Sequence, residues 1–361
     1  MKKIISYHPN KSTGIGGIET LVRSLQFVSS KLALSFVEYY NDIANDKKEH
    51  FDEKDTSVIY KKIKLPSYVN GQLREAMKGL LFAFKLIGHR SNSSDFIFIY
   101  HPVYLLFLFR FVLSKKTLIV VQSNRLDSLF SGRLAKLAFK LNGRNINKFC
   151  VYTSFDRDKL EKNYSFDQEK IQVIPRGCKL KSKSTTALYS KKLVTIARIH
   201  EHQKNFDKMI EVMKKIDSSY TLDIYGSGSD EEVLSLKIKI ADINNINYLG
   251  PTDNVAETLS GYSVFLMTSH YEGFGQTLIE ARSQGLPLVV FNNFEAATWL
   301  VKQGENGFLI NNNDVDDCVN KIKVLTIDEP TFNVFSNNCL KMANETDNEK
   351  IEKQWSQLLS E

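Results

Sequence analysis

Residues 271–281, with the sequence YEGFGQTLIEA, place two carboxylates on either side of a Gly-Phe-Gly turn. Glycines let the backbone come close to a ligand, and a helix that begins near Gln276 offers unpaired N–H groups and a positive dipole end to a phosphate. Glu272 and Glu280 suit hydroxyl groups, since carboxylates accept hydrogen bonds. The stretch therefore fits a nucleotide sugar, with a central phosphate and hydroxyl-rich rings at both ends. The alternative is a strand end followed by a solvated helix face.

Two cations follow the first apolar run of the same half of the chain. In ARIHEHQKNFD, Arg198 stands at the predicted strand end and Lys204 where the next helix begins. Fixed cations at adjacent strand ends neutralise a pyrophosphate leaving group well. A basic surface turn is the alternative interpretation.

Two glycine turns occupy similar positions between a predicted strand and a predicted helix. Gly226 lies in YGSGSD, which has only part of a dinucleotide-binding fingerprint and is interpreted as a tight turn near the nucleotide. Gly16 and Gly17 lie in GIGGIE, where backbone N–H groups can face a phosphate. A plain flexible loop is the alternative for the second turn.

Short apolar runs alternate with amphipathic segments, which predicts βαβ units and parallel sheets. The strands predicted for the first half are 3–7, 34–40, 57–61, 96–100, 117–121, 148–152 and 171–175, with helices that include 18–30, 71–89 and 127–141. Those predicted for the second half are 193–197, 221–225, 246–250, 263–267 and 287–291. The predicted fold class is α/β, with two Rossmann-like doubly wound domains facing a central cleft that binds ligands at strand ends.

Composition sets the domain boundaries and excludes several classes of protein. The polar segment 178–191 predicts a linker, so the domains are expected at 1–180 and 190–328, with helices over 329–361 packing back toward the first domain. Four scattered cysteines argue against a zinc site and a disulfide framework, and fit a reducing cytosol. The start becomes polar too soon for a signal peptide, and the longest apolar run, 104–113, is too short to span a bilayer.

The motifs resemble those of retaining GT-B glycosyltransferases of the glycosyl transferases group 1 type, family four of the sequence classification. The resemblance is carried by VTIARIHEHQKNFD, LDIYGSGSDEEV, NYLG, FLMTSHYEGFGQTLIEARSQGLPLVV and ENGFLI, over about 192–310. Lesser matches are GGIET and the segment SFDRDKLEKNYSFDQEKIQVIPRG. It implies an acceptor-binding domain followed by a donor-binding domain, a nucleotide-sugar donor that is usually UDP-linked, and no metal cofactor.

The resemblance also implies residue roles. Arg198 and Lys204 hold the diphosphate, Glu272 contacts sugar hydroxyls, and Glu280 binds the ribose. The remaining donor-binding candidates are backbone or side-chain groups in the glycine turns: Gly16, Gly17, Gly226, Gly273, Phe274, Gly275, Gln276 and Thr277. The implied outcome is transfer with retained anomeric configuration, with the leaving phosphate as base.

The sequence departs from the family pattern in three places, one in the first domain and two in the second. Family members commonly carry a histidine where this chain has Gln122 and Asn124, so an amide replaces the imidazole or the contact is lost. His101 is either a substitute near the acceptor and sugar or a structural histidine at a strand end. The stretch NFEAATWLV lacks the usual Pro-x-Glu, and the interval from Arg198 to Lys204 is one residue longer than usual.

Segments 71–90 and 104–116 combine apolar faces with cations. They either rest on an anionic membrane, giving access to a polyprenyl-diphosphate-linked glycan, or cover the first sheet with their cations in solvent. The first alternative places the protein in the cytoplasm, as a peripheral protein on the cytoplasmic face of the inner membrane. Its pathway would then be O-antigen, capsule or exopolysaccharide synthesis, and no nucleic-acid partner is expected. Competing functions are a UDP-sugar epimerase, a non-catalytic GT-B partner protein and an NAD-dependent dehydrogenase.

Overall fold

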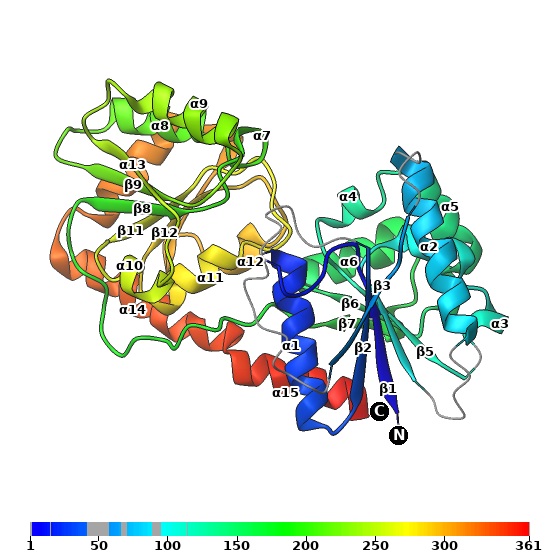
Figure 1. The fold of residues 1–361 in the computed structure, drawn as a ribbon. Coiled ribbons are helices and arrows are strands. Elements are labelled where there is room, and N and C mark those ends of the chain that lie inside the picture. Colours follow the sequence, from blue (N-terminus) through cyan, green and yellow to red (C-terminus); the bar gives the residue numbers. More distant parts are fainter. Residues whose placement is uncertain are drawn as a thin grey trace. The chain divides into compact units, whose positions relative to one another are not determined.

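The computed structural model describes residues 2–14, 16–41, 58–65, 71–88, 95–113 and 115–360. The chain divides into two compact units, one formed by Met1–Arg176 with Ile351–Glu361 and one by Gly177–Lys350. Each unit contains one sheet flanked by helices (Figure 1). The unit boundaries thus fall at 176 and 350, where the sequence analysis places them at 180 and 328.

The first unit is built on a seven-stranded sheet in the order β3-β2-β1-β4-β5-β6-β7, and every pairing in it is parallel. Its strands are β1 (Lys3–Tyr7), β2 (Ser35–Tyr40), β3 (Val58–Lys62), β4 (Phe96–Ile99), β5 (Thr117–Val121), β6 (Lys148–Val151) and β7 (Ile171–Val173). All seven overlap the predicted strands. The βαβ alternation was a reliable signal because such strands are buried on both faces and read as apolar runs.

Alternate side chains of these strands enter different cores. In β4, Phe96 and Phe98 pack in one core while Ile97 and Ile99 pack in the other, as expected for a pleated strand between two helical layers. The helical elements of this unit are α1 (Gly17–Lys31), α2 (Gly71–Gly88), η1 (Pro102–Phe107), α3 (Arg110–Leu113), α4 (Leu126–Leu129), α5 (Arg133–Asn142), η2 (Gly143–Asn145), α6 (Ser154–Tyr164) and η3 (Gln168–Lys170).

One predicted helix of the first unit is interrupted. The sequence predicts a helix over 127–141, whereas the structure has α4 and α5 with a break at Phe130–Gly132. Gly132 takes an extended conformation as the residue before α5. A glycine inside a helical pattern is a weak helix former, so the chain turns there.

The second unit has a six-stranded sheet in the order β10-β9-β8-β11-β12-β13, again parallel throughout. Its strands are β8 (Lys192–Ile196), β9 (Thr221–Tyr225), β10 (Ile246–Gly250), β11 (Val264–Met267), β12 (Leu288–Phe291) and β13 (Gly307–Ile310). The sequence analysis missed β13 as a strand. Its sequence, GFLI, begins with a glycine, which is depleted in strands, and is followed directly by three asparagines.

Helices connect the strands of the second unit as βαβ units require. They are α7 (Glu201–Lys204), α8 (Phe206–Lys215), α9 (Asp230–Ile240), α10 (Val255–Leu259), α11 (Gln276–Ser283), α12 (Ala297–Leu300), η4 (Asn311–Asn313), α13 (Val315–Leu325), α14 (Glu329–Ala343) and η5 (Asn344–Thr346). Residues 178–191 form no helix and no strand apart from a bridge between Cys178 and Asp347. The parallel arrangement brings every strand-to-helix loop to one edge of the sheet.

The helix α15 (Asn348–Ser360) completes the core of the first unit, to which its residues from Ile351 onward belong. Trp355 is 2% exposed and lies 6.2 Å from the ring of Phe98 in β4. Lys31 at the end of α1 forms an ion pair with Glu352 at 2.8 Å. One face of the first sheet is therefore covered by segments from both ends of the described chain.

We expect Trp355→Ala to destabilise the first unit by roughly 3–5 kcal/mol, since it removes a large buried side chain and leaves a cavity beside the sheet. Urea unfolding measures the loss in free energy of unfolding, and hydrogen exchange of the β4 amides shows whether it falls on the first unit. Lys353→Ala, on the exposed side of the same helix, is the matched control and should change stability little. Equal stability of the two variants would contradict the packing role of Trp355.

Candidate functional site

The loops that follow β8 and β9 are in direct backbone contact. A Cβ atom on Gly226, whose φ is 146°, would lie 1.7 Å from the carbonyl oxygen of Ala197. The Ile199 N–H donates to the carbonyl of Ser227 at 2.8 Å. Only glycine fits at position 226, so this residue fixes the end of β9 against the segment that carries Arg198.

The short helix α7 is fastened to the loop after β11 by its last residues. The Thr268 hydroxyl donates to the carbonyl oxygen of Lys204 at 3.0 Å, and the Asn205 side-chain amide donates to the carbonyl of Thr268 at 3.1 Å. Asn205 has a φ of 56°, a left-handed conformation that Asn tolerates better than most residues. The turn ends α7 and begins α8, and it directs Lys204 toward the glycine turn.

Lys204 and Glu272 form the central interaction of this edge. The ammonium group of Lys204 lies 2.5 Å from one carboxylate oxygen of Glu272, which also accepts a hydrogen bond from Ser269 Oγ at 2.8 Å. Both side chains are largely buried, at 12% and 10% exposure. A buried charge is costly unless it is paired, so each residue offsets the cost of burying the other.

The Gly-Phe-Gly turn packs against Trp299 through Phe274. Gly275 has a φ of 93° and immediately precedes α11. Phe274 is buried, with its ring 5.9 Å from that of Trp299. The Arg282 guanidinium lies over the Trp299 ring, 5.8 Å from its centroid, and forms an ion pair with Glu345 at 3.2 Å. Burial lowers the pKa of the Arg282 guanidinium, while Glu345 opposes that shift.

The predicted donor-binding residues of α11 take different positions. Gln276 is the first helical residue, and its side-chain amide donates to the carbonyl of Gly177 at 3.1 Å, which ties the turn to the start of the unit. Thr277 and Glu280 are half-buried on the same helix. Gly273 is half-buried in the turn, and Arg198 is exposed after β8.

The structure thus brings most predicted donor residues to one edge of the second sheet. They come from three loops, at the carboxyl ends of β8, β9 and β11. This edge offers two cations, a carboxylate, a helix start that no side chain caps and glycines that permit close approach. Within the described residues, no group of three or more His, Cys, Asp or Glu side chains is placed to hold a metal ion.

The first unit carries the other predicted residues. Gly16 precedes α1, and a Cβ atom there would lie 2.1 Å from Glu19 Oε2, so a larger residue would displace that side chain. The carbonyl of Gly17 accepts a hydrogen bond from Arg176 at 2.5 Å. Both glycines lie beyond the carboxyl end of β1, and their approach to a phosphate stays a prediction.

A buried cluster that the sequence analysis did not identify holds the loop before Gly16. Glu38 in β2 is fully buried and accepts hydrogen bonds from the backbone N–H of Ser12 at 2.7 Å and from its hydroxyl at 2.5 Å. His8 Nε2 lies 3.4 Å from the same carboxylate, and Gln26 donates to it at 2.7 Å. The available signal was a glutamate inside the apolar run LSFVEYY.

The residues at the expected histidine position are mostly engaged within the fold. Gln122 has no exposed surface, and its amide donates to Asp156 at 3.0 Å and accepts from the Tyr152 N–H at 3.0 Å. It links β5, β6 and α6, and its burial leaves it no surface for an acceptor. Asn124 is half-buried and accepts from the Arg125 N–H at 2.8 Å.

His101 caps the helix η1, where its Nδ1 accepts a hydrogen bond from the Val103 N–H at 3.1 Å. Burial lowers the pKa of its imidazole, with Glu75 acting in the opposite sense and Lys78 in the same sense. A neutral imidazole is the form that can accept this hydrogen bond. The geometry supports the structural alternative of the sequence analysis.

Comparison with known proteins identifies the second unit. Residues 179–342 match the family Glycosyl transferases group 1. The poly(glycerol-phosphate) alpha-glucosyltransferase of Bacillus subtilis is 33% identical over 151 residues, which are 42% of this chain and 22% of that protein. The UDP-Gal:alpha-D-GlcNAc-diphosphoundecaprenol alpha-1,3-galactosyltransferase of Escherichia coli is 36% identical over 91 residues, which are 25% of this chain and 23% of that protein.

The fold of the whole chain is shared with solved GT-B glycosyltransferases. The pneumococcal O-GlcNAc transferase GtfA, crystallised with UDP and GlcNAc, aligns with a TM-score of 0.74 at 16% identity, covering 99% of this chain and 98% of that one. The two-domain α/β architecture predicted from the sequence is therefore confirmed. The chain spans between 22% and 64% of the length of the curated relatives that it matches first.

We expect Glu272→Gln to bind UDP roughly tenfold more tightly than the wild type, because Lys204 loses a charged hydrogen-bond partner, worth roughly 1.5 kcal/mol, that competes with phosphate. Isothermal titration with UDP measures the change. Glu211→Gln breaks an exposed ion pair with Lys208, 2.7 Å away in α8 of the same unit, and should leave UDP affinity unchanged. Weaker UDP binding by Glu272→Gln would show that the carboxylate supports the nucleotide rather than competing for Lys204.

Proposed function

We propose that the protein is a retaining glycosyltransferase that moves a hexose-type sugar from a UDP-linked donor to a glycan acceptor. The observation that carries the proposal is the pair of Lys204 and Glu272 beside the glycine turn, within a unit that matches Glycosyl transferases group 1. A diphosphate satisfies the cation and sugar hydroxyls satisfy the carboxylate. A nucleotide sugar can offer a phosphate to Lys204 and a hydroxyl group to Glu272 at once. A simple phosphate or a free sugar can offer a partner to only one of the two residues.

The proposed reaction exchanges one bond at the anomeric carbon of the sugar. The bond from C1 to the diphosphate oxygen breaks, the acceptor hydroxyl oxygen bonds to C1 on the same face, and its proton passes to the departing phosphate oxygen. Arg198 and Lys204 stabilise the negative charge that develops on the diphosphate. A cationic pair serves this purpose without a metal ion, so the reaction is proposed to run in EDTA.

The donor is held by the remaining residues of the same edge. Glu280 accepts hydrogen bonds from the ribose hydroxyls, and the backbone at Gly273, Gly275 and Gly226 approaches the sugar and the phosphates. UDP is proposed as the carrier because the GtfA structure that shares this fold was crystallised with UDP and GlcNAc.

The acceptor is proposed to be a polyprenyl-diphosphate-linked glycan of bacterial surface polysaccharide synthesis, such as O-antigen, capsule or exopolysaccharide. This is supported by the partial match to a galactosyltransferase named for a diphosphoundecaprenol-linked substrate and by the match to a poly(glycerol-phosphate) glucosyltransferase. Such an acceptor requires the protein to work at the cytoplasmic face of the inner membrane, as a peripheral protein.

Thermal stabilisation against UDP-, GDP-, ADP- and dTDP-sugars tests the proposal, because a ligand that binds only the folded state raises Tm by mass action. We expect UDP-sugars to raise Tm selectively and Glu280→Ala to lose most of that shift. A missing response to every nucleotide would favour the non-catalytic partner protein. An isomerised UDP-sugar formed without an acceptor would instead identify an epimerase.

Arg198→Ala should lower kcat about 100- to 1,000-fold while changing donor affinity much less, because one preorganised charge-stabilising group is worth roughly 3–4 kcal/mol of barrier. The measurement is transfer from the stabilising donor to the acceptor found by screening, carried out in EDTA. Lys214→Ala, an exposed cation of α8 in the same unit, is the matched control. Unchanged turnover in Arg198→Ala would remove this residue from the mechanism.

A further inference from the structure

The first unit has a strongly basic surface that the proposed reaction does not use. We call it the basic face and define it by seven cations from α3, α5, η2, η3 and the loop before β5: Arg110, Lys115, Lys116, Lys136, Lys140, Arg144 and Lys170. None of the seven forms an ion pair with a carboxylate in the part of the chain that the structure describes. Their charge is therefore available to an external anion.

The charge of this region is one-sided in the sequence as well. Between Phe96 and Phe155 the chain has nine lysines and arginines and one acid, Asp127. That acid is already neutralised, since it pairs with Lys159 at 2.6 Å. The net charge of the whole chain is only +7, so most of the excess positive charge is concentrated here.

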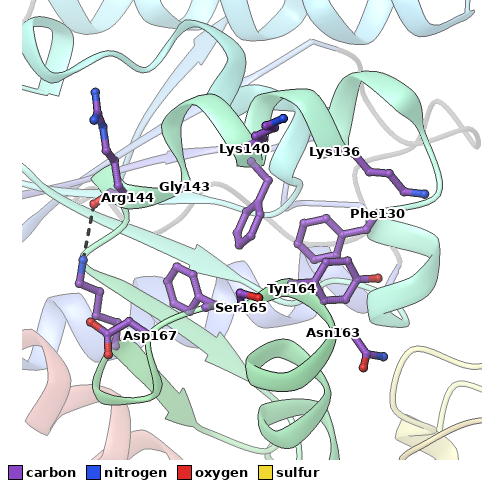
Figure 2. A pocket seen from close by; sticks show the side chains of 12 residues that line it. Phe130, Lys136, Lys140, Gly143, Arg144, Asn163, Tyr164, Ser165 and Asp167 are labelled. Carbon is purple, nitrogen blue, oxygen red and sulfur yellow. Dashed lines mark hydrogen bonds between the residues drawn. The ribbon is translucent and has the colours of Figure 1, made fainter.

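A groove with an aromatic floor runs beneath part of the basic face (Figure 2). It has a volume of about 720 Å³ and is floored by four rings, Phe130, Phe139, Tyr164 and Phe166. Lys136 and Lys140 rise from α5 along one side, while Asp167 and Arg144 lie at one end. The Lys170 ammonium donates to the backbone carbonyl of Arg144 at 3.5 Å, and both residues line the groove.

Large apolar side chains stand exposed next to these cations. Phe109 and Phe111 flank Arg110, with exposures of 42% and 73%, and their rings stack at 5.9 Å with an angle of 6°. On α5, Leu137 and Leu141 alternate with the lysines and are 44% and 49% exposed. Exposed aromatic rings beside unpaired cations are unfavourable in water alone and favourable at a lipid interface.

The basic face lies at the edge of the sheet opposite the predicted acceptor residues. Lys116 and Lys170 immediately precede β5 and β7, at the amino ends of parallel strands. His101 and Asn124 follow β4 and β5, at the carboxyl ends. A five-residue strand separates the two edges by roughly 15 Å, so the basic face is distinct from the predicted acceptor site.

We propose that the basic face docks on an anionic phospholipid bilayer, with Phe109 and Phe111 in the interface and the cations on lipid phosphates. Charge complementarity selects an anionic surface, and the exposed rings select a bilayer over a soluble polyanion, which would leave them in water. No helix in the described ranges has the length and apolar character needed to cross a bilayer. The inference deepens the proposed membrane location and needs no step of the transfer reaction.

Vesicle co-sedimentation of the full chain tests the proposal without any nucleotide. We expect binding to vesicles that contain 30% phosphatidylglycerol and little binding to pure phosphatidylcholine. The combined variant Lys136→Gln, Lys140→Gln, Arg144→Gln should weaken partition roughly 100-fold, at about fivefold per basic residue. The double variant Phe109→Ala, Phe111→Ala should retain weak binding that high salt abolishes.

A matched control comes from α9 of the second unit. Leu234 and Ile238 are 58% and 67% exposed there and flank Lys237. The triple variant Leu234→Ala, Ile238→Ala, Lys237→Gln should bind vesicles as the wild type does. Unchanged Tm of each variant shows that the substituted side chains are dispensable for folding.

Three results would overturn the proposal: no binding of the wild type to anionic vesicles, wild-type binding by the Lys136, Lys140 and Arg144 variant, or displacement from vesicles by a poly(glycerol phosphate) chain that binds more tightly to the same cations. The last result would make a soluble polyanion the occupant. Because the assay contains no donor, loss of vesicle binding and loss of nucleotide binding are independent observations.

Discussion

The candidate site depends on a single requirement, that Lys204 and Glu272 neutralise each other in a nearly buried position. Either charge would be costly to bury there alone. The requirement determines what surrounds the pair. Thr268 and Asn205 bind α7 to the end of β11, and Ser269 satisfies a further lone pair of the carboxylate. A ligand with one anionic part and one hydroxyl-rich part fits this site because it can take over both charges without leaving either unpaired.

Backbone proximity is the second determinant, and it explains why the site is made of loops. Gly226 contacts the carbonyl of Ala197 at a distance that excludes any side chain, and Gly275 adopts a left-handed conformation at the start of α11. The turn that ends at Gly275 is held by the packing of Phe274 against Trp299 and of Trp299 against Arg282. Packing and backbone contacts thus hold the loops, and the charged side chains of the site lie at the carboxyl edge of the second sheet.

The sequence analysis located the strands and the glycine turns that follow them because both leave local signals. Buried parallel strands appear as apolar runs, and strand-to-helix turns that need glycine show it directly. Contacts between distant segments leave no such signal. The Arg282–Glu345 pair, the Glu38 carboxylate under the loop of Ser12 and the burial of Gln122 depend on partners that only the folded chain brings together. The strand β13 was missed because it begins with a glycine and runs into three asparagines, and the break before α5 was missed because it is marked by a single glycine.

The helix α15 has a consequence for how the protein is made. Its residues from Ile351 onward belong to the first unit, yet all of the second unit is synthesised before them. While the ribosome translates residues 177–350, the face of the first sheet around Phe98 lacks the cover that Trp355 supplies. The first unit must therefore wait with an apolar surface open to chaperones until these residues are made. Its folding is completed by the arrival of a segment made roughly 175 residues later, at about 5–20 residues per second.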